Sequence, residues 1–265
     1  MAALTGCKTT AASTGLTGNQ RKDIYGDTTK AMSLILGSEV DIARKDVKAA
    51  QMPFYYGSRQ KPKDVFGDGT PEFYAFHKAN KQVAPGAVEL MDVLLSSWQA
   101  YELSHDWVMP DGFTVHCPTM VATEDKIEVD ELDHASFKYV YKINWGTEKG
   151  LSIAANTIHS IDGMVVREMC RRCNYDREKL QHTLNLIVRS RQFQNAHRVV
   201  FNCTPEIETL ATQSGFYSLV AVEHINEDSV YEFSEEYLLC IQELIVECMR
   251  HKSFPVVTIH KPLWM

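Results

Sequence analysis

The stretch from Arg44 to Gly57 constrains the fold of this chain most, because its basic and aromatic residues recur at the spacing of an α-helix. The residues that this spacing places on one helical face are Arg44, Lys48, Met52, Tyr55 and Tyr56. Two cations one turn apart suit a triphosphate, and an aromatic ring two turns further on can lie against a base or a sugar. The stretch therefore predicts a helical nucleotide-binding surface. The alternative is a solvated basic face followed by an aromatic anchor before a glycine stop.

The charge of the chain is distributed unevenly. With 265 residues, 45% of them apolar, the chain can bury a substantial core, and its net charge of −7 argues against a nucleic-acid partner. Residues 1–63, however, hold ten basic and five acidic side chains, whereas residues 205–249 hold ten acidic side chains and no Lys or Arg. The basic part contains the predicted nucleotide-binding helix, as phosphate contact requires. We expect the acidic part to face away from a template or toward another protein.

The sequence shows no sign of membrane insertion or export. No apolar run reaches the length of a bilayer span, and the first residues lack a basic flank followed by a long apolar stretch, so we expect a cytoplasmic protein without a membrane partner. Seven cysteines without a regular framework fit a reducing compartment. The pair Cys170 and Cys173 lacks the two further ligands of a zinc site and lies inside a helical run, so we predict buried free thiols.

Apolar periodicity predicts a mainly α fold with a small antiparallel sheet, an α+β class. No internal repeat or low-complexity tract is present. The expected elements are an irregular segment over 1–18, a helix over 20–36, the basic helix from about Ser38 with a bend at Pro53, a loop over 62–71, a helix over 85–101, strands over 113–115 and 137–143, and helices from about 150.

The order Arg, three residues, Lys, seven residues, Tyr-Gly resembles the finger-helix motif of single-subunit RNA polymerases of phages and mitochondria, and of the related repair-type DNA polymerases. Residues 107–115, Trp-Val-Met-Pro-Asp-Gly-Phe-Thr-Val, look like that family's strand-turn-strand, and residues 156–163, Asn-Thr-Ile-His-Ser-Ile-Asp-Gly, resemble its Asn-x-x-His-Ser-x-Asp element. A weaker match, Asp-Ile-Tyr-Gly at 23–26, lies upstream in the expected order. The resemblance implies fingers over 1–160 and a partial palm of a right-hand polymerase over 161–265, with an atypical acidic insert at about 166–250.

Two positions at which the branches of this family differ point to RNA synthesis. Met52 stands where the DNA branch usually has Phe, and His159-Ser160 stands where it has Gln-Gly. The resemblance therefore implies a DNA-directed RNA polymerase whose partners are a DNA template, ribonucleoside triphosphates and the RNA product, in the host cytoplasm if a phage encodes it. Ser160 is implied to contact the template, and His159 the growing end of the hybrid, as one of the catalytic residues.

The remaining roles that the resemblance implies fall on the basic helix. Arg44 and Lys48 are implied to bind the phosphates of the incoming nucleotide, with Met52 beside them, and Tyr56 to lie near the ribose and favour ribonucleotides. Lys48 and Tyr56 are thereby counted among the catalytic residues, together with His159. Gly57 is implied to let the template backbone approach closely.

The sequence does not show the metal-binding aspartates of the polymerase family that it resembles. Polymerases of this kind use two Mg²⁺ ions bridged by two aspartates. Residues 1–20 hold no replacement for the first, and residues 254–260, which look like the strand that delivers the second, are followed by Lys261. We expect no metal ligand in this chain. The two aspartates are expected on a missing segment or on a complementary polymerase chain, and the isolated chain is expected to be inactive. The alternatives are a non-catalytic module that binds nucleic acid or regulates a polymerase, and a structural α-domain.

Overall fold

A computed structural model describes residues 1–37, 40–197 and 204–250, and the side chains of 194–197 are not described. The chain divides into two compact units: residues 1–107 with 116–158 form the first, and residues 108–115 with the chain from 159 onward form the second. Helix α8 (Ser152–Cys173) runs through the boundary at residue 158 and through the predicted boundary at 160. The assignment of fingers and palm stays a prediction.

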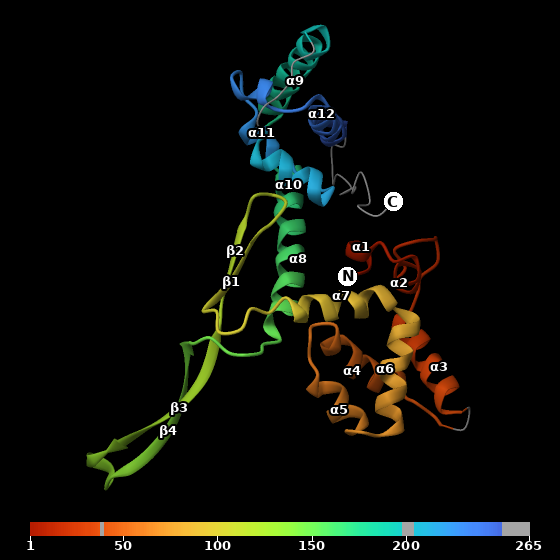
Figure 1. Cartoon of the computed structure of the whole chain (residues 1–265), viewed down its shortest axis with the longest axis vertical. Coiled ribbons are helices and arrows are strands. Elements are labelled where there is room, and N and C mark those ends of the chain that lie inside the picture. Colours follow the sequence, from red (N-terminus) through yellow and green to blue (C-terminus); the bar gives the residue numbers. More distant parts are fainter. Residues whose placement is uncertain (38–39, 198–203, 251–265) are drawn as a thin grey trace. The chain divides into compact units, whose positions relative to one another are not determined.

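Seven helices lie in the described part of the first unit (Figure 1). They are α1 (Ala2–Thr5), α2 (Lys8–Ser13), α3 (Ile24–Leu36), α4 (Arg44–Phe54), α5 (Gln60–Phe66), α6 (Pro71–Val83) and α7 (Pro85–Ser96). The prediction of an irregular segment over 1–18 is wrong, because α1 and α2 form there. The predicted loop over 62–71 is also wrong in its first half, where α5 accommodates Pro62 in its first turn.

The basic helix begins later than its sequence suggests. Helix α4 starts at Arg44, after Ala43 in extended conformation, and Asp46 is the acid of its first turn. The predicted start of the helix, Ser38, lies outside the described residues. Pro53 is in the last turn of α4, which ends one residue later.

The first unit has an apolar core with a polar centre. Buried side chains of α3, α4, α6 and α7 form the core: Met32, Val47, Ala50, Phe54, Phe76, Ala79 and Val88. Gln51 is fully buried among them, and its Nε2 donates to Thr28 Oγ1 at 3.0 Å and to Asn80 Oδ1 at 2.8 Å. These two bonds connect α4 to α3 and α6 through the amide nitrogen and fix the register between the three helices. The face of α4 opposite the core is thereby turned outward.

Two separate two-stranded sheets replace the one small sheet expected, and the α+β class is confirmed. Strands β1 (Ser104–Val108) and β2 (Thr114–Pro118) form one sheet; β3 (Met120–Val129) and β4 (Ala135–Asn144) form an antiparallel ribbon joined by the short 3-10 helix η1 (Asp130–Leu132). The strand predicted over 137–143 lies within β4. Between β1 and β2, Gly112 N bonds Met109 O at 2.8 Å and Gly112 has φ +76°, a tight turn that needs glycine.

The second unit is helical around its own core. After α8 come α9 (Arg177–His197), α10 (Glu206–Ser214), α11 (Ala221–His224), η2 (Ser229–Glu232) and α12 (Glu235–Arg250). Helix α12 buries one stripe, which includes Leu238, Ile241, Leu244 and Ile245, in the cluster that α9 and the segment 219–233 complete. No helix in the described part of the chain is long and apolar enough to cross a bilayer.

Candidate functional site

The outward face of α4 presents part of the predicted set. Arg44, Lys48 and Met52 are exposed, because Val47, Ala50, Gln51 and Phe54 take the inward positions of the helix. The shared-face prediction is therefore confirmed for these three residues, at successive i, i+4 positions. They form an open surface with two cations at one end and a flexible thioether at the other.

The cation at the start of α4 is held by the N-terminal end of α3. Arg44 makes a bidentate ion pair with Asp23, with Nε to Oδ2 at 2.6 Å and Nη2 to Oδ1 at 2.9 Å. The guanidinium bond lowers the pKa of Asp23 to about 2. Both side chains are about half exposed, so the pair contributes little to stability and its partners can be exchanged.

Tyr25 contacts both cations of the outward face of α4. The Arg44 Cζ lies 5.5 Å from the centroid of the Tyr25 ring and the Lys48 Nζ lies 5.9 Å from it. Both distances are within the range of a cation–π contact. Asp23, Tyr25, Arg44 and Lys48 thus form one cluster, which we call the α3–α4 cluster. Its formal charge is +1, and the Asp23 carboxylate occupies the Arg44 guanidinium.

The residues that follow α4 are divided between core and surface. Tyr55 does not share the outward face, contrary to the prediction: its hydroxyl donates to Asn80 Oδ1 at 2.8 Å, and burial raises its pKa to about 12. Tyr56 is 37% exposed. Gly57 is buried with φ +92°, and a Cβ there would meet the Leu151 carbonyl oxygen at 3.2 Å. The backbone that approaches Gly57 closely is therefore this chain's own, and a template contact stays a prediction.

His159 and Ser160 lie in α8, in the part that belongs to the second unit. His159 is exposed and Ser160 is half-buried, and each makes interactions within the protein. Their implied contacts with the template and the hybrid stay predictions.

The Pro-Asp-Gly turn between β1 and β2 is bound to α8 by ion pairs. Asp111, whose side chain is fully buried, accepts Arg167 Nε at 2.7 Å, Arg167 Nη2 at 2.9 Å and Arg171 Nη1 at 3.0 Å. Burial alone raises the pKa of Asp111, but the two guanidinium partners outweigh it and the pKa falls below its usual value. Arg167 also lies over the Phe113 ring, 4.1 Å from its centroid. Asp111 therefore has an architectural role.

A second buried ion pair lies in the same two turns of α8 and was missed by the sequence reasoning. Glu168 accepts Arg172 Nε at 2.7 Å, Ser218 Oγ at 2.6 Å and Leu219 N at 2.9 Å, and Arg172 also donates to Tyr217 O at 3.3 Å. Glu168 and Arg172 are at most 2% exposed. Their i, i+4 spacing, repeated by Arg167 and Arg171, was the signal that could have found them.

The adjacent residues His105 and Asp106 lie in β1. His105 is buried, its ring lies 4.1 Å from that of Trp98, and its Nε2 accepts Gln99 N at 3.1 Å. Asp106 is exposed, and hydrogen bonds from Ser104 and His116 lower its pKa. With its imidazole packed and its carboxylate bound, this pair does not provide open metal ligands.

Within the described ranges, one group of three side chains could hold a cation: Glu128, Asp130 and His134, whose ligand atoms lie within 4.8 Å of one another. All three are exposed, at the η1 end of the β3–β4 ribbon. Mg²⁺ prefers oxygen ligands, and a polymerase needs two aspartates that bridge two ions. One imidazole and two carboxylates bound to its Nδ1 do not fit that requirement.

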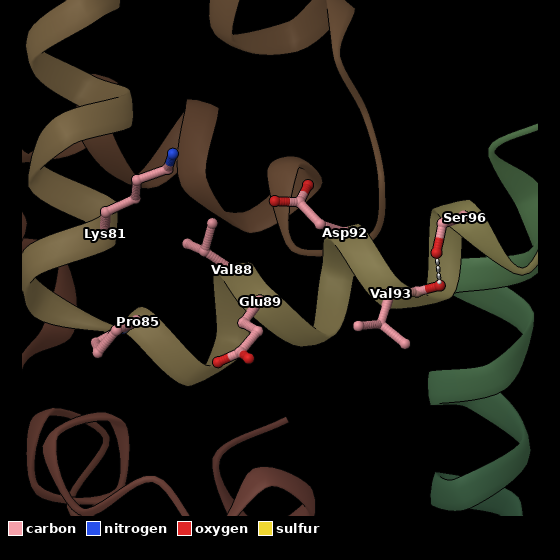
Figure 2. Close-up of a pocket in the computed structure, with 7 residues that line it drawn as sticks. All are labelled: Lys81, Pro85, Val88, Glu89, Asp92, Val93 and Ser96. Atoms are coloured by element: carbon pink, nitrogen blue, oxygen red, sulfur yellow. Dashed lines mark hydrogen bonds between the residues drawn. The ribbon is translucent and has the colours of Figure 1, made fainter.

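The cavities of the first unit do not select a ligand by charge. A groove of about 530 Å³ follows α7 (Figure 2), where Val88 and Asp92 extend to one side of the helix and Glu89 and Val93 to the other. Lys81 adds a cation from α6, while Asp92 is paired with Arg59 at 3.1 Å. Since the lining holds the cation of Lys81 and the carboxylates of Glu89 and Asp92, the groove lacks the concentration of positive charge that a phosphate ligand requires.

Comparison with known proteins adds no relative. No protein-family model matches the chain, and no curated protein matches it either.

Proposed function

We propose that this chain supplies the nucleotide-binding face of a phage-type DNA-directed RNA polymerase, binding an incoming ribonucleoside triphosphate and the DNA template during transcription. The observation that carries the proposal is the α3–α4 cluster. Two segments that resemble the polymerase family, 23–26 and 44–57, come together in it, and they place two cations around one tyrosine ring.

The chemistry of the cluster fits a triphosphate. A guanidinium binds phosphate oxygens in a bidentate manner, and an ammonium one turn away can bind the next phosphate as a point charge. Arg44 and Lys48 are exposed, so phosphate can reach both without unfolding the core. Met52 continues the outward face of α4, and the exposed Tyr56 follows the end of that helix; the proposal places them near the base and the ribose.

The proposal assigns binding to this chain and the metal chemistry to another. The one candidate cation group among the described residues does not fit two bridged Mg²⁺ ions. We therefore infer a complementary polymerase chain that contributes both aspartates, and we expect no template-dependent RNA synthesis by the purified chain alone. RNA synthesis by that chain, lost when Asp162 is changed, would overturn this part of the proposal.

The test of the binding face is equilibrium binding of a fluorescent ribonucleoside triphosphate to the purified full chain. Each charge-assisted contact is worth roughly 1.5–3 kcal/mol, so Arg44→Ala and Lys48→Ala should each weaken binding by about tenfold to a hundredfold. Lys45→Ala is the matched control, because it removes the same charge from an exposed position of α4 outside the face.

The Lys45→Ala control distinguishes a defined triphosphate site from a general attraction of anions to the basic surface. If Lys45→Ala weakens binding as much as Lys48→Ala does, the surface attracts anions only by its net charge, and the solvated-face interpretation is correct. If the wild-type chain binds single-stranded DNA in the same assay but no triphosphate, the non-catalytic nucleic-acid-binding alternative replaces the polymerase proposal.

A further inference from the structure

The last turn of α8 carries two accessible thiols. Cys170 and Cys173 are free and exposed, which corrects the prediction that they are buried. They are at positions i and i+3 of one helix, and Cys173 is the final helical residue. The two residues between them are Arg171 and Arg172, which bind the buried carboxylates of Asp111 and Glu168.

We infer that Cys170 and Cys173 form a dithiol modification site that closes to an intrahelical disulfide, and that closure weakens the buried ion pairs of the second unit. In an α-helix, Cα atoms three residues apart are about 5 Å from each other, inside the range of disulfide-bonded pairs. Their Cβ atoms are roughly 5–6 Å apart, whereas a disulfide needs about 3.5–4.5 Å. The last turn must therefore tighten.

The position of the pair allows this movement. Helix α8 ends at Cys173, and its last backbone bond there, from Asn174 N to Cys170 O, is 2.9 Å long. A helix terminus loses few hydrogen bonds when its final turn rearranges. Because the thiols are exposed, a small oxidant can reach both of them.

The reaction needs a low-molecular-weight disulfide such as glutathione disulfide. One cysteine thiolate attacks that disulfide and forms a mixed disulfide, releasing one glutathione thiolate, which takes up a proton. The second cysteine loses its proton and displaces the other glutathione, so that two protein thiols are oxidised and two glutathione molecules are produced.

The arginines between the thiols link this reaction to the unit's interior. Tightening the turn from Cys170 to Cys173 shifts the backbone of Arg171 and Arg172. Arg171 Nη1 is 3.0 Å from Asp111 Oδ2, and Arg172 Nε is 2.7 Å from Glu168 Oε1, so a shift of about 1 Å lengthens both bonds beyond hydrogen-bond range. The Glu168 carboxylate, which also accepts Leu219 N, then loses the cation that holds it.

The experiment exposes the full chain to graded mixtures of glutathione and glutathione disulfide. Peptide mapping by mass spectrometry should find a bridge between Cys170 and Cys173, and hydrogen exchange of the Leu219 amide should become at least about tenfold faster in the oxidised chain. Cys170→Ser should instead keep a glutathione adduct on Cys173, with Leu219 exchange as in the reduced protein. Cys7→Ser, which changes a thiol of the first unit, should behave as wild type.

Three results would overturn the inference. Stable glutathione adducts on both cysteines of the wild type would show that the turn cannot close. A bridge from Cys173 to the buried Cys248 would identify a different disulfide. An intrahelical bridge that leaves Leu219 exchange unchanged would show that the thiols and the ion pairs are independent.

Discussion

Replacing the Glu168 carboxylate by an amide tests the buried network of α8 most directly. Glu168→Gln keeps the size of the side chain but removes the charge that faces Arg172, whose guanidinium is 2% exposed. The amide retains one oxygen, which can still accept Leu219 N or Ser218 Oγ but not both with the same geometry. The substitution therefore isolates the ion pair while preserving most of the packing.

The expected loss in the free energy of unfolding is large because the buried Arg172 guanidinium cannot be hydrated. Removing one partner of a buried pair typically costs about 3–5 kcal/mol, against a total stability of roughly 5–15 kcal/mol for a domain. An exposed pair such as Asp23–Arg44 contributes far less to stability, because water screens both of its charges. The magnitude alone thus distinguishes a buried network from a surface contact.

The assay is denaturant unfolding combined with hydrogen exchange of the Leu219 amide, since a chain of two units need not unfold in one transition. The double substitution Glu168→Gln with Arg172→Met removes both charges and should recover stability to within about 2 kcal/mol of wild type. Glu243→Gln, at an exposed position of α12, is the control and should change stability by less than about 0.5 kcal/mol. A loss below about 1 kcal/mol for Glu168→Gln would refute the buried ion pair.

Three further outcomes are expected for Tyr56, Gly57 and Asp23 of the first unit. Tyr56→Phe should bring the affinities for ribo- and deoxyribonucleoside triphosphates closer together, because only the hydroxyl can sense the ribose, and an unchanged ratio counts against the assigned role. Gly57→Ala should destabilise the chain by about 1–2 kcal/mol at φ +92°, whereas Gly163→Ala, inside α8, should not; equal stabilities contradict the strained geometry. By NMR, the carboxyl of Asp23 should titrate with a pKa of about 2 and move toward its ordinary value of 3.8 in Arg44→Ala. Because this pKa is lowered, the stabilisation by the pair is complete above about pH 4 and is lost as pH falls toward 2.

Local sequence patterns determined the basic helix and its exposed face. Arg44, Lys48 and Met52 recur every four residues, and the apolar Val47, Ala50 and Phe54 fall on the opposite side, so helix geometry decides which side faces water. The same reasoning placed β4, where aromatic and polar residues alternate over 137–143. The periodicity of a helix or a strand is a local property of the sequence, so it can be read without knowing which distant residues are in contact.

Tertiary structure decided the neighbours of that face. Asp23 and Tyr25 lie about twenty residues upstream of α4, and their contacts with Arg44 and Lys48 depend on how α3 packs across the core. Tyr55 shows the limit of periodicity, since the helix ends at Phe54 and the buried Asn80 draws its hydroxyl inward. Burial, too, is set by distant residues.

Glu168 and Cys170 illustrate this last point within one helix. Both are two residues or fewer from an arginine, and their sequence surroundings are alike. One is fully buried because Ser218 and Leu219 from a segment about fifty residues away bond to it, and the other is exposed because no described segment covers it. The i, i+4 spacing of opposite charges can be read from the sequence. The exclusion of water that makes such an ion pair strong arises only when distant segments pack over it.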